Sequence, residues 1–381
     1  MHSPTVVATL NRTPQDAADV KSYVIGPDSL ADAMHSIDTV LHLAARNNDK
    51  DGELADFIKD NCEFTHDLYL AAVKAGVKTF IFVTTTHAIW PIRPSDYAKS
   101  KAAAEARLRD AEQPECKIIF VRLPAVWGQG ATGKLGMIST CPPAIRPIVH
   151  SALRSLQPIA GVTHVINTIA GIVENPQAPD EVMISDPIGR FSPYHIFSLA
   201  LHLALIVAVA TVLLPFLLCA AVIVKLTSKG PAIFAQERVG YQKSVFKCLK
   251  FRTMYRDTAN AASHEVGADQ ITRVGHILRK TKLDELPQAW NILRGEMRLI
   301  GPRPGLPAQH ELSASRAARG IYDMKPGITG LAQVQQIDMS TPERLALEDY
   351  RYHHTRSIVT DIKILIATVL GRGAGDAAQK R

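Results

Sequence analysis

The chain has 381 residues, of which 46% are hydrophobic, and it carries a net charge of +7. Length and composition predict two domains with buried cores, and the charge fits an anionic partner such as a phosphate or a lipid head group. The five cysteines lie far apart without a Cys-x-x-Cys pair, which argues against a zinc site or a disulfide framework and fits a reducing compartment. The N-terminus lacks the pattern of a secretory signal.

The first half of the chain predicts a parallel sheet covered by helices. Short apolar runs such as TVLHLAA and KTFIFVTT alternate with amphipathic stretches such as DNCEFTHDLYLAAVKAG. Fully apolar strands that alternate with helices indicate a parallel sheet with helices on both faces. The expected fold class of this half is therefore α/β.

A possible proton-transfer pair occurs in the segment YAKSK. Tyr97 and Lys101 are four residues apart and therefore share one face of a helix. A lysine ammonium beside a phenol lowers the pKa of the phenol and can orient a cofactor ribose, which suits chemistry next to a hydride carrier. Tyrosine and lysine occur at this spacing often by chance, so the pair alone does not establish such a site.

The motifs around this pair carry a resemblance. The order of DTVLHLAA, Asn61, AGVKTFIFVTTT, YAKSK and VRLPAVWGQG resembles the extended short-chain dehydrogenase/reductases of the sugar-nucleotide epimerase group, over about residues 5–185. The resemblance implies that Thr86 hydrogen-bonds the substrate and that Tyr97 and Lys101 are the acid/base pair.

The same family opens with a strand and a glycine-rich turn that seats the cofactor pyrophosphate. This sequence begins at what resembles the second strand and contains no such turn before it. Residues 1–190 are therefore expected to form a truncated, incomplete Rossmann-like domain. We expect it to be a scaffold or a sugar-nucleotide-binding relic rather than a working oxidoreductase with NAD(P). A mis-assigned start would produce the same absence.

Residues 191–225 predict a membrane-inserted helix. From Ile196 to Val224 there is no acidic or basic side chain apart from the titratable His202. About 29 residues at ~1.5 Å each can reach across a hydrocarbon layer of ~30 Å. Helices this apolar are rare in soluble domains, although a buried core helix is the alternative. Pro215 removes a backbone donor inside the segment and is expected to kink the helix.

A cluster of cations follows this segment, in a region that also predicts a hairpin of two short strands, PAIFAQERVG and SVFKCLKF. Such a cluster beside a membrane segment is attracted to anionic head groups and marks the cytoplasmic side; an ordinary solvated basic face is the alternative. The first domain is of a type whose ligands, sugar nucleotides and nicotinamides, are cytoplasmic. A straight single span would put the two domains on opposite sides of the membrane, so a kinked, re-entrant helix is favoured. The cluster consists of Lys225, Lys229, Arg238, Lys243, Lys247, Lys250 and Arg252.

Two adjacent carboxylates stand out in LRKTKLDELPQAWNILRGEMRLIGPRP. Asp284 follows Arg279 and Lys280 by about one helical turn, and nearby cations keep a carboxylate ionised and attract a second anion such as a diphosphate. A carboxylate beside bound phosphate can act as a nucleophile, and the neighbouring Glu285 can hold Mg²⁺ together with substrate oxygens. The stretch predicts one helix, with Leu278, Leu283, Leu286, Trp290 and Leu293 on or near its buried face.

Arg303 lies between two prolines, Pro302 and Pro304, on a stiffened turn that suits a planar base or a phosphate. Together with the carboxylates, this turn predicts phosphoryl transfer. The alternative is a surface helix stabilised by charge pairs four residues apart and followed by an ordinary proline turn.

The second half also carries a resemblance, over residues 196–370. SKGPAIFAQERVG, FKCLKFRTM, the LDELPQ and GPRP stretch, YDMKPGITGLAQVQ and DIKILIATVL occur in the order typical of bacterial sugar transferases known as monotopic polyprenyl-phosphate phosphoglycosyl transferases. The resemblance implies that Asp284 attacks the sugar-linked phosphate of a UDP-sugar, that UMP leaves, and that polyprenyl (undecaprenyl) phosphate then takes the phosphosugar from the enzyme.

The resemblance also implies a small α/β transferase domain, over residues 226–370, behind a kinked re-entrant helix. Asp284 and Glu285 would be the catalytic pair and would hold Mg²⁺. This chain departs from the family where the helix begins, at PYHIFS, and at Leu214-Pro215, where a Ser-Pro pair is usual. The resemblance implies that Arg279 contacts the phosphates and that the turn Pro302, Arg303 and Pro304 contacts the nucleoside. Lys280 is expected to bind phosphate because of its position next to Arg279.

The sequence as a whole predicts an enzyme on the cytoplasmic face of the bacterial inner membrane that initiates a surface glycan such as an exopolysaccharide or O-antigen. Expected partners are a UDP-sugar, polyprenyl phosphate, membrane lipids, a second copy of the chain and downstream glycosyltransferases, and no nucleic acid. Two alternatives stay open: a bifunctional enzyme whose first domain also reduces or epimerises the UDP-sugar at C4, and a non-catalytic membrane scaffold. Residues 371–381 are predicted to be a disordered tail.

Overall fold

The computed structural model describes residues 8–11, 21–24, 34, 36–47, 52–89, 95–128, 131, 133–175, 177–208, 211, 214–227, 229–255 and 270–371. The predicted tail lies outside these residues apart from Gly371. Contacts divide the chain into two compact units. The first comprises Met1–Pro142 and Ile159–Asp186, and the second comprises Pro143–Pro158 and Pro187–Arg381.

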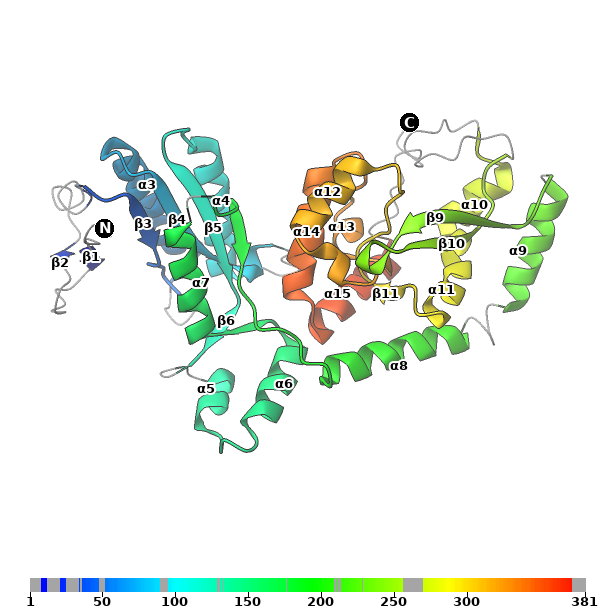
Figure 1. Ribbon diagram of the computed structural model, residues 1–381, viewed down its shortest axis with the longest axis horizontal. Coiled ribbons are helices and arrows are strands. Elements are labelled where there is room, and N and C mark those ends of the chain that lie inside the picture. Colours follow the sequence, from blue (N-terminus) through cyan, green and yellow to red (C-terminus); the bar gives the residue numbers. More distant parts are fainter. Residues whose placement is uncertain are drawn as a thin grey trace. The chain divides into compact units, whose positions relative to one another are not determined.

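A four-stranded parallel sheet forms the centre of the first unit (Figure 1). Its strands, in hydrogen-bonded order, are β3 (Thr39–His42), β4 (Thr79–Thr85), β5 (Lys117–Leu123) and β8 (Glu181–Met183). The central strands β4 and β5 are buried on both faces because helices cover both sides of the sheet. The predicted α/β class with a parallel sheet is thus confirmed.

Two apolar clusters hold these layers together. One joins the sheet to α2 (Leu54–Ile58), α3 (Phe64–Lys74) and α4 (Asp96–Ala111). The other joins the opposite face to α7 (Val162–Glu174). A π-helical turn, Lys59–Glu63, connects α2 to α3. The unit also contains α5 (Gly133–Thr140) and a small parallel pair formed by β6 (Ala125–Trp127) and β7 (Ile159–Gly161).

The first two strands form a sheet of their own. β1 (Ala8–Asn11) pairs in parallel with β2 (Lys21–Val24), and among the described residues no ladder joins this pair to β3. In a doubly wound sheet of order 3-2-1-4-5-6, the first strand lies between the second and the fourth. If β1 and β2 correspond to the second and third strands, as the sequence indicates, the described residues contain no strand for that central position.

The second unit combines helices with two short sheets. β9 (Ile233–Val239) and β10 (Val245–Phe251) form the predicted antiparallel hairpin, which is confirmed, and β11 (Arg298–Ile300) pairs in parallel with β12 (Gly327–Thr329). The helices are α6 (Arg146–Leu156), α8 (Pro193–Ala208), α9 (Leu214–Thr227), α10 (Arg273–Thr281), α11 (Ala289–Leu293), α12 (His310–Ala318), α13 (Leu331–Val334), α14 (Pro342–Thr355) and α15 (Ile358–Val369).

The predicted membrane segment consists of two helices, α8 and α9, in the described residues. Pro215 is the second residue of α9, where a missing N–H is tolerated because donors of the first turn have no intrahelical partner. None of the helices in the described part of the chain combines the length and the apolar character needed to cross a membrane. One face of α8 nevertheless exposes more than half of each of four apolar side chains, Ile196, Leu199, Leu203 and Val207.

The single helix predicted around the two carboxylates is wrong. α10 ends at Thr281, and Lys282 adopts a left-handed conformation with φ of 57°. A 3₁₀ helix, Leu283–Gln288, follows, and α11 begins after it. The break rotates the later residues out of the expected register, so Trp290 and Leu293 are exposed rather than buried.

Close backbone contacts, which leave no room for a side chain, fix the position of the GPRP turn that begins at Gly301. The amide of Gly327 donates to the carbonyl of Pro302, and the amide of Gly301 donates to the carbonyl of Thr329, each at 2.9 Å. A Cβ on Gly327 would lie 2.1 Å from the nitrogen of Gly301, and one on Gly330 would lie 2.2 Å from the oxygen of Gly301. The glycines of the KPGITG loop therefore set the position of Arg303.

Gly327→Ala is expected to destabilise the second unit by about 2 kcal/mol or more, because the added methyl cannot fit without moving backbone. Thermal unfolding of the full chain measures the effect. The matched control is Gly171→Ala in the interior of α7, where a Cβ would meet nothing within 4 Å. That substitution is expected to stabilise the chain by about 0.5–1 kcal/mol. Equal stability of the two variants would contradict the close packing.

Candidate active site

The acidic pair lies on the 3₁₀ helix between α10 and α11, directly against β10 (Figure 1). Asn291, on α11, fixes this position by bonding to the edge of the strand. Its side-chain oxygen accepts from the amide of Leu249 at 3.0 Å, and its side-chain nitrogen donates to the carbonyl of Lys247 at 2.8 Å. The 3₁₀ helix thereby brings Asp284 and Glu285 beside Lys250.

Glu285 is held by two cations. Oε1 of Glu285 lies 3.0 Å from Nζ of Lys250 and 3.0 Å from Nη2 of Arg303. Burial alone would raise the pKa of Glu285, but the charges of Lys250 and Arg303 and the lysine hydrogen bond outweigh it and hold this pKa well below its usual range. Glu285 is therefore a fixed negative charge at any physiological pH.

Asp284 has the opposite character. Burial, together with the charge of Glu285, raises the pKa of Asp284 to about 6, although Lys250, Arg279 and Arg303 act against this rise. At pH 7, about nine tenths of such a group is ionised. Asp284 is consequently a carboxylate that is mostly charged at neutral pH and more basic than an ordinary aspartate, which suits a nucleophile.

Arg279 supplies an unused donor, and its charge acts on Asp284. Its Nε donates to Oγ1 of Thr253 at 2.9 Å, while its Nη1 is buried with no hydrogen-bond partner among the described residues. The helix that carries it approaches Thr253 closely, because a Cβ on Gly275 would lie 2.1 Å from the Thr253 carbonyl oxygen. A fixed guanidinium with a free N–H is well suited to a phosphate oxygen.

Lys280 does not take part in this arrangement. It is exposed near the end of α10, and no hydrogen bond or ion pair joins it to Asp284 or Glu285 within the described part of the chain. The predicted phosphate contact of Lys280 therefore stays an expectation. Arg303, in contrast, is paired with Glu285, and the charge of Arg279 acts on Asp284.

The turn that carries Arg303 is held by two further arginines. Nη1 of Arg238 donates to the carbonyl of Pro304 at 3.0 Å, and Nη1 of Arg316 donates to the carbonyl of Arg303 at 2.9 Å. Arg316 also forms a buried ion pair with Asp349 at 2.6 Å. Sequence reasoning missed Arg316 because its partners lie far away along the chain and no local motif marks it.

The interpretation of the cations after the membrane segment as one basic face is wrong in part. Arg238 is buried against Gln236 and Pro304. Arg252 is buried as well and donates to the carbonyls of Pro231 and Val224. Alternation along β9 sends Arg238 to the interior, and Arg252 is turned inward to its two carbonyl acceptors. Both cations are therefore buried inside the protein rather than displayed on its basic surface. The exposed members of the cluster are Lys225, Lys229, Lys243 and Lys247.

Arg316→Met is expected to cost about 3–5 kcal/mol of the free energy of unfolding, because it leaves the buried Asp349 carboxylate without its partner. Urea denaturation of the purified chain measures the loss. Arg319→Met is the control, since its ion pair with Glu343 is partly exposed and should contribute about 1 kcal/mol or less. A loss of similar size in both variants would show that the Arg316 pair has no special role.

Asp284 and Glu285 could bind Mg²⁺ only if the substrate supplies further ligands. Within the described residues, no group of three or more His, Cys, Asp or Glu side chains could hold a metal ion. Mg²⁺ commonly takes one or two carboxylates and completes its shell with substrate phosphate oxygens and water. Asp284 and Glu285 supply that number, although Oε1 of Glu285 is already engaged by two cations.

The first unit does not arrange Tyr97 and Lys101 for the predicted chemistry. Nζ of Lys101 donates to the carbonyl of Val83 at 3.0 Å and lies 4.6 Å from the centre of the Phe82 ring. Burial lowers the pKa of Lys101 to about 8 and raises that of Tyr97. The phenol therefore lacks the lowered pKa that the spacing suggested, and the buried ammonium does not fit the holder of a cofactor ribose. Thr86 is buried at the end of β4.

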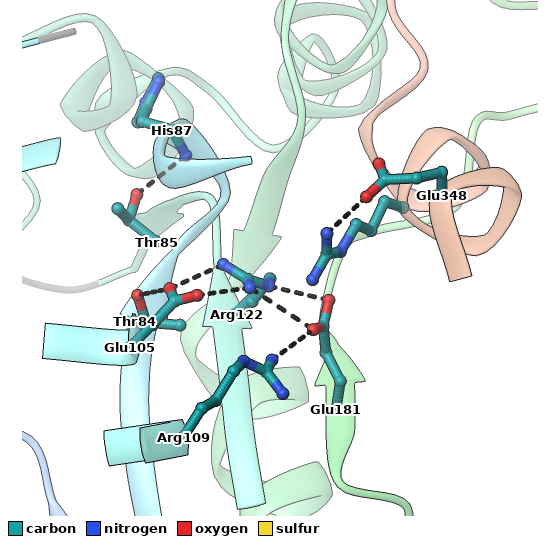
Figure 2. Close-up of polar contacts among 9 residues, drawn as sticks. Thr84, Thr85, His87, Glu105, Arg109, Arg122, Glu181 and Glu348 are labelled. Carbon is teal, nitrogen blue, oxygen red and sulfur yellow. Dashed lines mark hydrogen bonds and ion pairs between the residues drawn. The ribbon is translucent and has the colours of Figure 1, made fainter. Parts of the chain in front are cut away.

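A buried ionic network lies on β5 in the same unit. Figure 2 shows Arg122 between Glu105 and Glu181, with nitrogen–oxygen distances of 2.6 Å to Glu105 and 2.8 Å to Glu181. Thr84 donates to Glu105 at 2.6 Å, and Arg109 lies 3.3 Å from Glu181 (Figure 2). The network joins β4, α4, β5 and β8, so it serves to order these elements. No local motif in the sequence marks it.

Comparison with known proteins divides the chain in a similar way. The model of the family described as bacterial sugar transferase matches residues 194–372, and that of the NAD dependent epimerase/dehydratase family matches residues 4–159. The UDP-glucose:undecaprenyl-phosphate glucose-1-phosphate transferase of Caulobacter vibrioides is 44% identical over 167 residues, which cover 41% of this chain and 61% of that protein. The chain thus spans less than two thirds of this relative.

The exopolysaccharide production protein ExoY of Sinorhizobium fredii is covered almost completely. It is 35% identical over 218 residues, which make up 51% of this chain and 93% of that protein. Among solved structures, the UDP-N-acetylglucosamine 4-epimerase from Bacillus cereus is similar at 16% identity and a TM-score of 0.39, over 51% of this chain and 73% of that chain.

Proposed function

We propose that this chain, which belongs to the bacterial sugar transferase family, transfers a sugar 1-phosphate from a UDP-sugar to polyprenyl phosphate and releases UMP. The observation that carries this proposal is the contrast between two adjacent carboxylates. Glu285 is kept ionised by its ion pairs with Lys250 and Arg303, while burial and the charge of Glu285 leave Asp284 unusually basic. An ionised, basic carboxylate beside an arginine with a free N–H is an arrangement suited to attack on phosphorus.

The proposed reaction has two displacements. In the first, a carboxylate oxygen of Asp284 bonds to the sugar-linked phosphorus, and the bond from that phosphorus to the bridging oxygen breaks, so UMP leaves with the electron pair. In the second, an oxygen of polyprenyl phosphate bonds to the same phosphorus and the Asp284 carboxylate leaves. Undecaprenyl phosphate is the acceptor expected in most bacteria.

The surrounding residues would act on the phosphates and the nucleoside. Nη1 of Arg279, buried and unpartnered among the described residues, would donate to a phosphate oxygen and stabilise charge that develops in the displacement. Arg303, held on its turn by Arg238 and Arg316, would face the nucleotide while it keeps Glu285 charged. Asp284 and Glu285 would hold Mg²⁺, which would supply positive charge to neutralise the phosphates.

We further propose that the chain lies on the cytoplasmic face of the bacterial inner membrane and initiates a surface glycan. The exposed apolar face of α8 supports insertion of this helix into a lipid layer, because solvent-exposed apolar stripes are rare on soluble proteins. The exposed lysines near α9 and the hairpin support contact with anionic head groups. α8 and α9 would enter and leave through the same face.

For the first unit, we propose a scaffold or a site that binds a sugar nucleotide without reducing or oxidising it. The buried Lys101 ammonium, bonded to the Val83 carbonyl, supports this proposal against the alternative of an active oxidoreductase. That alternative requires turnover of a nicotinamide cofactor that is lost in Tyr97→Phe, and absorbance at the wavelength of the reduced nicotinamide would detect it.

The test of the transferase uses full-length protein in nanodiscs with Mg²⁺, undecaprenyl phosphate and a panel of UDP-sugars, with chromatography of the released nucleotide. We expect UMP from at least one donor. Without the acceptor, UMP should stop at about one equivalent per enzyme, because the covalent intermediate cannot turn over. Release of UDP instead of UMP would contradict the proposal, and so would the absence of nucleotide release with every donor.

A further inference from the structure

The second unit contains a cavity with an excess of positive charge. It has a volume of about 290 Å³ and is lined by Arg298, Lys325 and Arg356, with Asp323 as the carboxylate on its wall. Asp284, Glu285, Arg279 and Arg303 are not among its lining residues. Among the described residues, the lining of this cavity therefore carries three basic side chains and one carboxylate.

In the described part of the chain, none of these three cations has a direct ion-pair partner. Among the described residues, the side chains of Arg298, Lys325 and Arg356 form no hydrogen bond or ion pair, and Nε of Arg356 is buried without any partner. A buried N–H without an acceptor carries a free-energy cost, and cations gathered on one wall repel one another. An anion in the cavity would remove both costs.

The cavity is built rather than accidental. The amide of Arg356 donates to the carbonyl of Tyr352 at 2.8 Å, and the carbonyl of Arg356 accepts from Nη1 of Arg154 at 3.1 Å. The backbone of Arg298 donates to the carbonyl of Pro326 at 2.8 Å. Both arginine backbones are therefore fixed, while their side chains are left for a ligand.

The other wall residues offer few competing acceptors. Tyr194 and Tyr352 both line the cavity, and each donates its hydroxyl hydrogen at 2.9 Å to the carboxylate of the buried Asp361. This carboxylate is thereby occupied behind the tyrosines. His195 lines the same cavity as Arg298 and Arg356, and burial, followed by the charges of these two arginines, lowers its pKa.

We propose that this cavity binds a phosphate group, at a site separate from the carboxylates of the reaction. Three unpaired cations match the charge of a phosphate or diphosphate, and the volume is close to the lower limit of roughly 300 Å³ for small-ligand clefts. It therefore suits a phosphate head better than a whole sugar nucleotide. His195 lies directly before the exposed apolar face of α8 that begins at Ile196, so the phosphate can be free in solution or carried by a lipid.

Two titrations of the full chain distinguish these sources. Inorganic diphosphate is titrated in detergent by calorimetry, and nanodiscs of phosphatidylcholine are compared with and without phosphatidic acid. We expect Arg356→Gln and Lys325→Gln each to weaken binding about tenfold in at least one titration. An effect on diphosphate alone assigns a free phosphate, and an effect on phosphatidic acid assigns a lipid head group.

Two comparison variants keep the test specific. Lys363→Gln removes one positive charge from an exposed position on α15 and should leave both titrations unchanged. Arg279→Gln removes the donor at the reaction carboxylates and should leave the Arg356-dependent binding intact. No binding by the unmodified chain would overturn the proposal, as would equal binding by Arg356→Gln and Lys363→Gln or complete loss in Arg279→Gln alone. Release of UMP is a separate measurement, so the two proposals fail independently.

Discussion

Replacement of Asp284 by asparagine is expected to reduce UMP release on the order of 10⁴-fold, because the amide has nearly the same shape but cannot attack phosphorus. The single equivalent of UMP released without acceptor should disappear as well. Chromatography of the nucleotide at saturating donor measures both quantities. Glu311→Gln, which neutralises an exposed acid at the start of α12, is the control and should retain full activity.

Stability measurements separate this loss from unfolding. A buried aspartate whose pKa is raised to about 6 opposes folding at every pH at which it is ionised in the folded chain. The neutral amide in the Asp284→Asn variant should therefore leave the free energy of unfolding equal or higher at pH 8. An Asp284→Asn variant that folds normally and still releases UMP at the normal rate would exclude Asp284 as the nucleophile.

Glu285→Gln should change both the rate and its dependence on pH. In the unmodified chain, kcat/KM is expected to fall as the pH drops through about 6, where Asp284 takes up a proton. The variant removes the negative charge that helps to raise this pKa and releases Lys250 and Arg303 to lower it, so the acidic limb should move to lower pH. At pH 8 the rate should fall on the order of 10²-fold, since a charge that organises the site is lost.

The measurement is a profile of kcat/KM against pH at constant ionic strength, with Glu311→Gln as the control. An acidic limb that stays at the same pH in Glu285→Gln, or moves upward, would show that the Asp284 pKa does not govern it. The direction of the shift distinguishes this account from a general loss of structure, which would lower the rate without moving the limb downward.

The sequence singled out those parts of the candidate site that are formed by residues close together along the chain. Asp284 and Glu285 are adjacent, and Arg303 lies between two prolines, so short motifs are enough to single these residues out. The break at Lys282 could not be predicted, because a left-handed lysine has no glycine to mark it. The supports of the turn, Arg238 and Arg316, depend on contacts with residues far along the chain.

In the first unit, too, the secondary structure could be predicted from the sequence pattern, whereas a long-range side-chain contact could not. Alternation of apolar strands and helices predicted the parallel sheet, since that periodicity is a direct consequence of burial on both faces. The orientation of Lys101 could not be read in this way. Four-residue spacing puts Tyr97 and Lys101 on one face of α4, but the ammonium of Lys101 binds the carbonyl of Val83, on a strand far away in sequence.

The assignment of α6 to the second unit has a consequence for how this chain can be divided. This helix, Arg146–Leu156, contacts α8 and α15, and its Arg154 donates to the carbonyl of Arg356. The residues that flank it in sequence, up to Pro142 and from Ile159 to Asp186, belong to the first unit. The two folds are therefore interleaved along one polypeptide. Any single cut that removes the whole first unit also removes α6, so a truncation meant to isolate the second unit has to keep Arg146–Leu156.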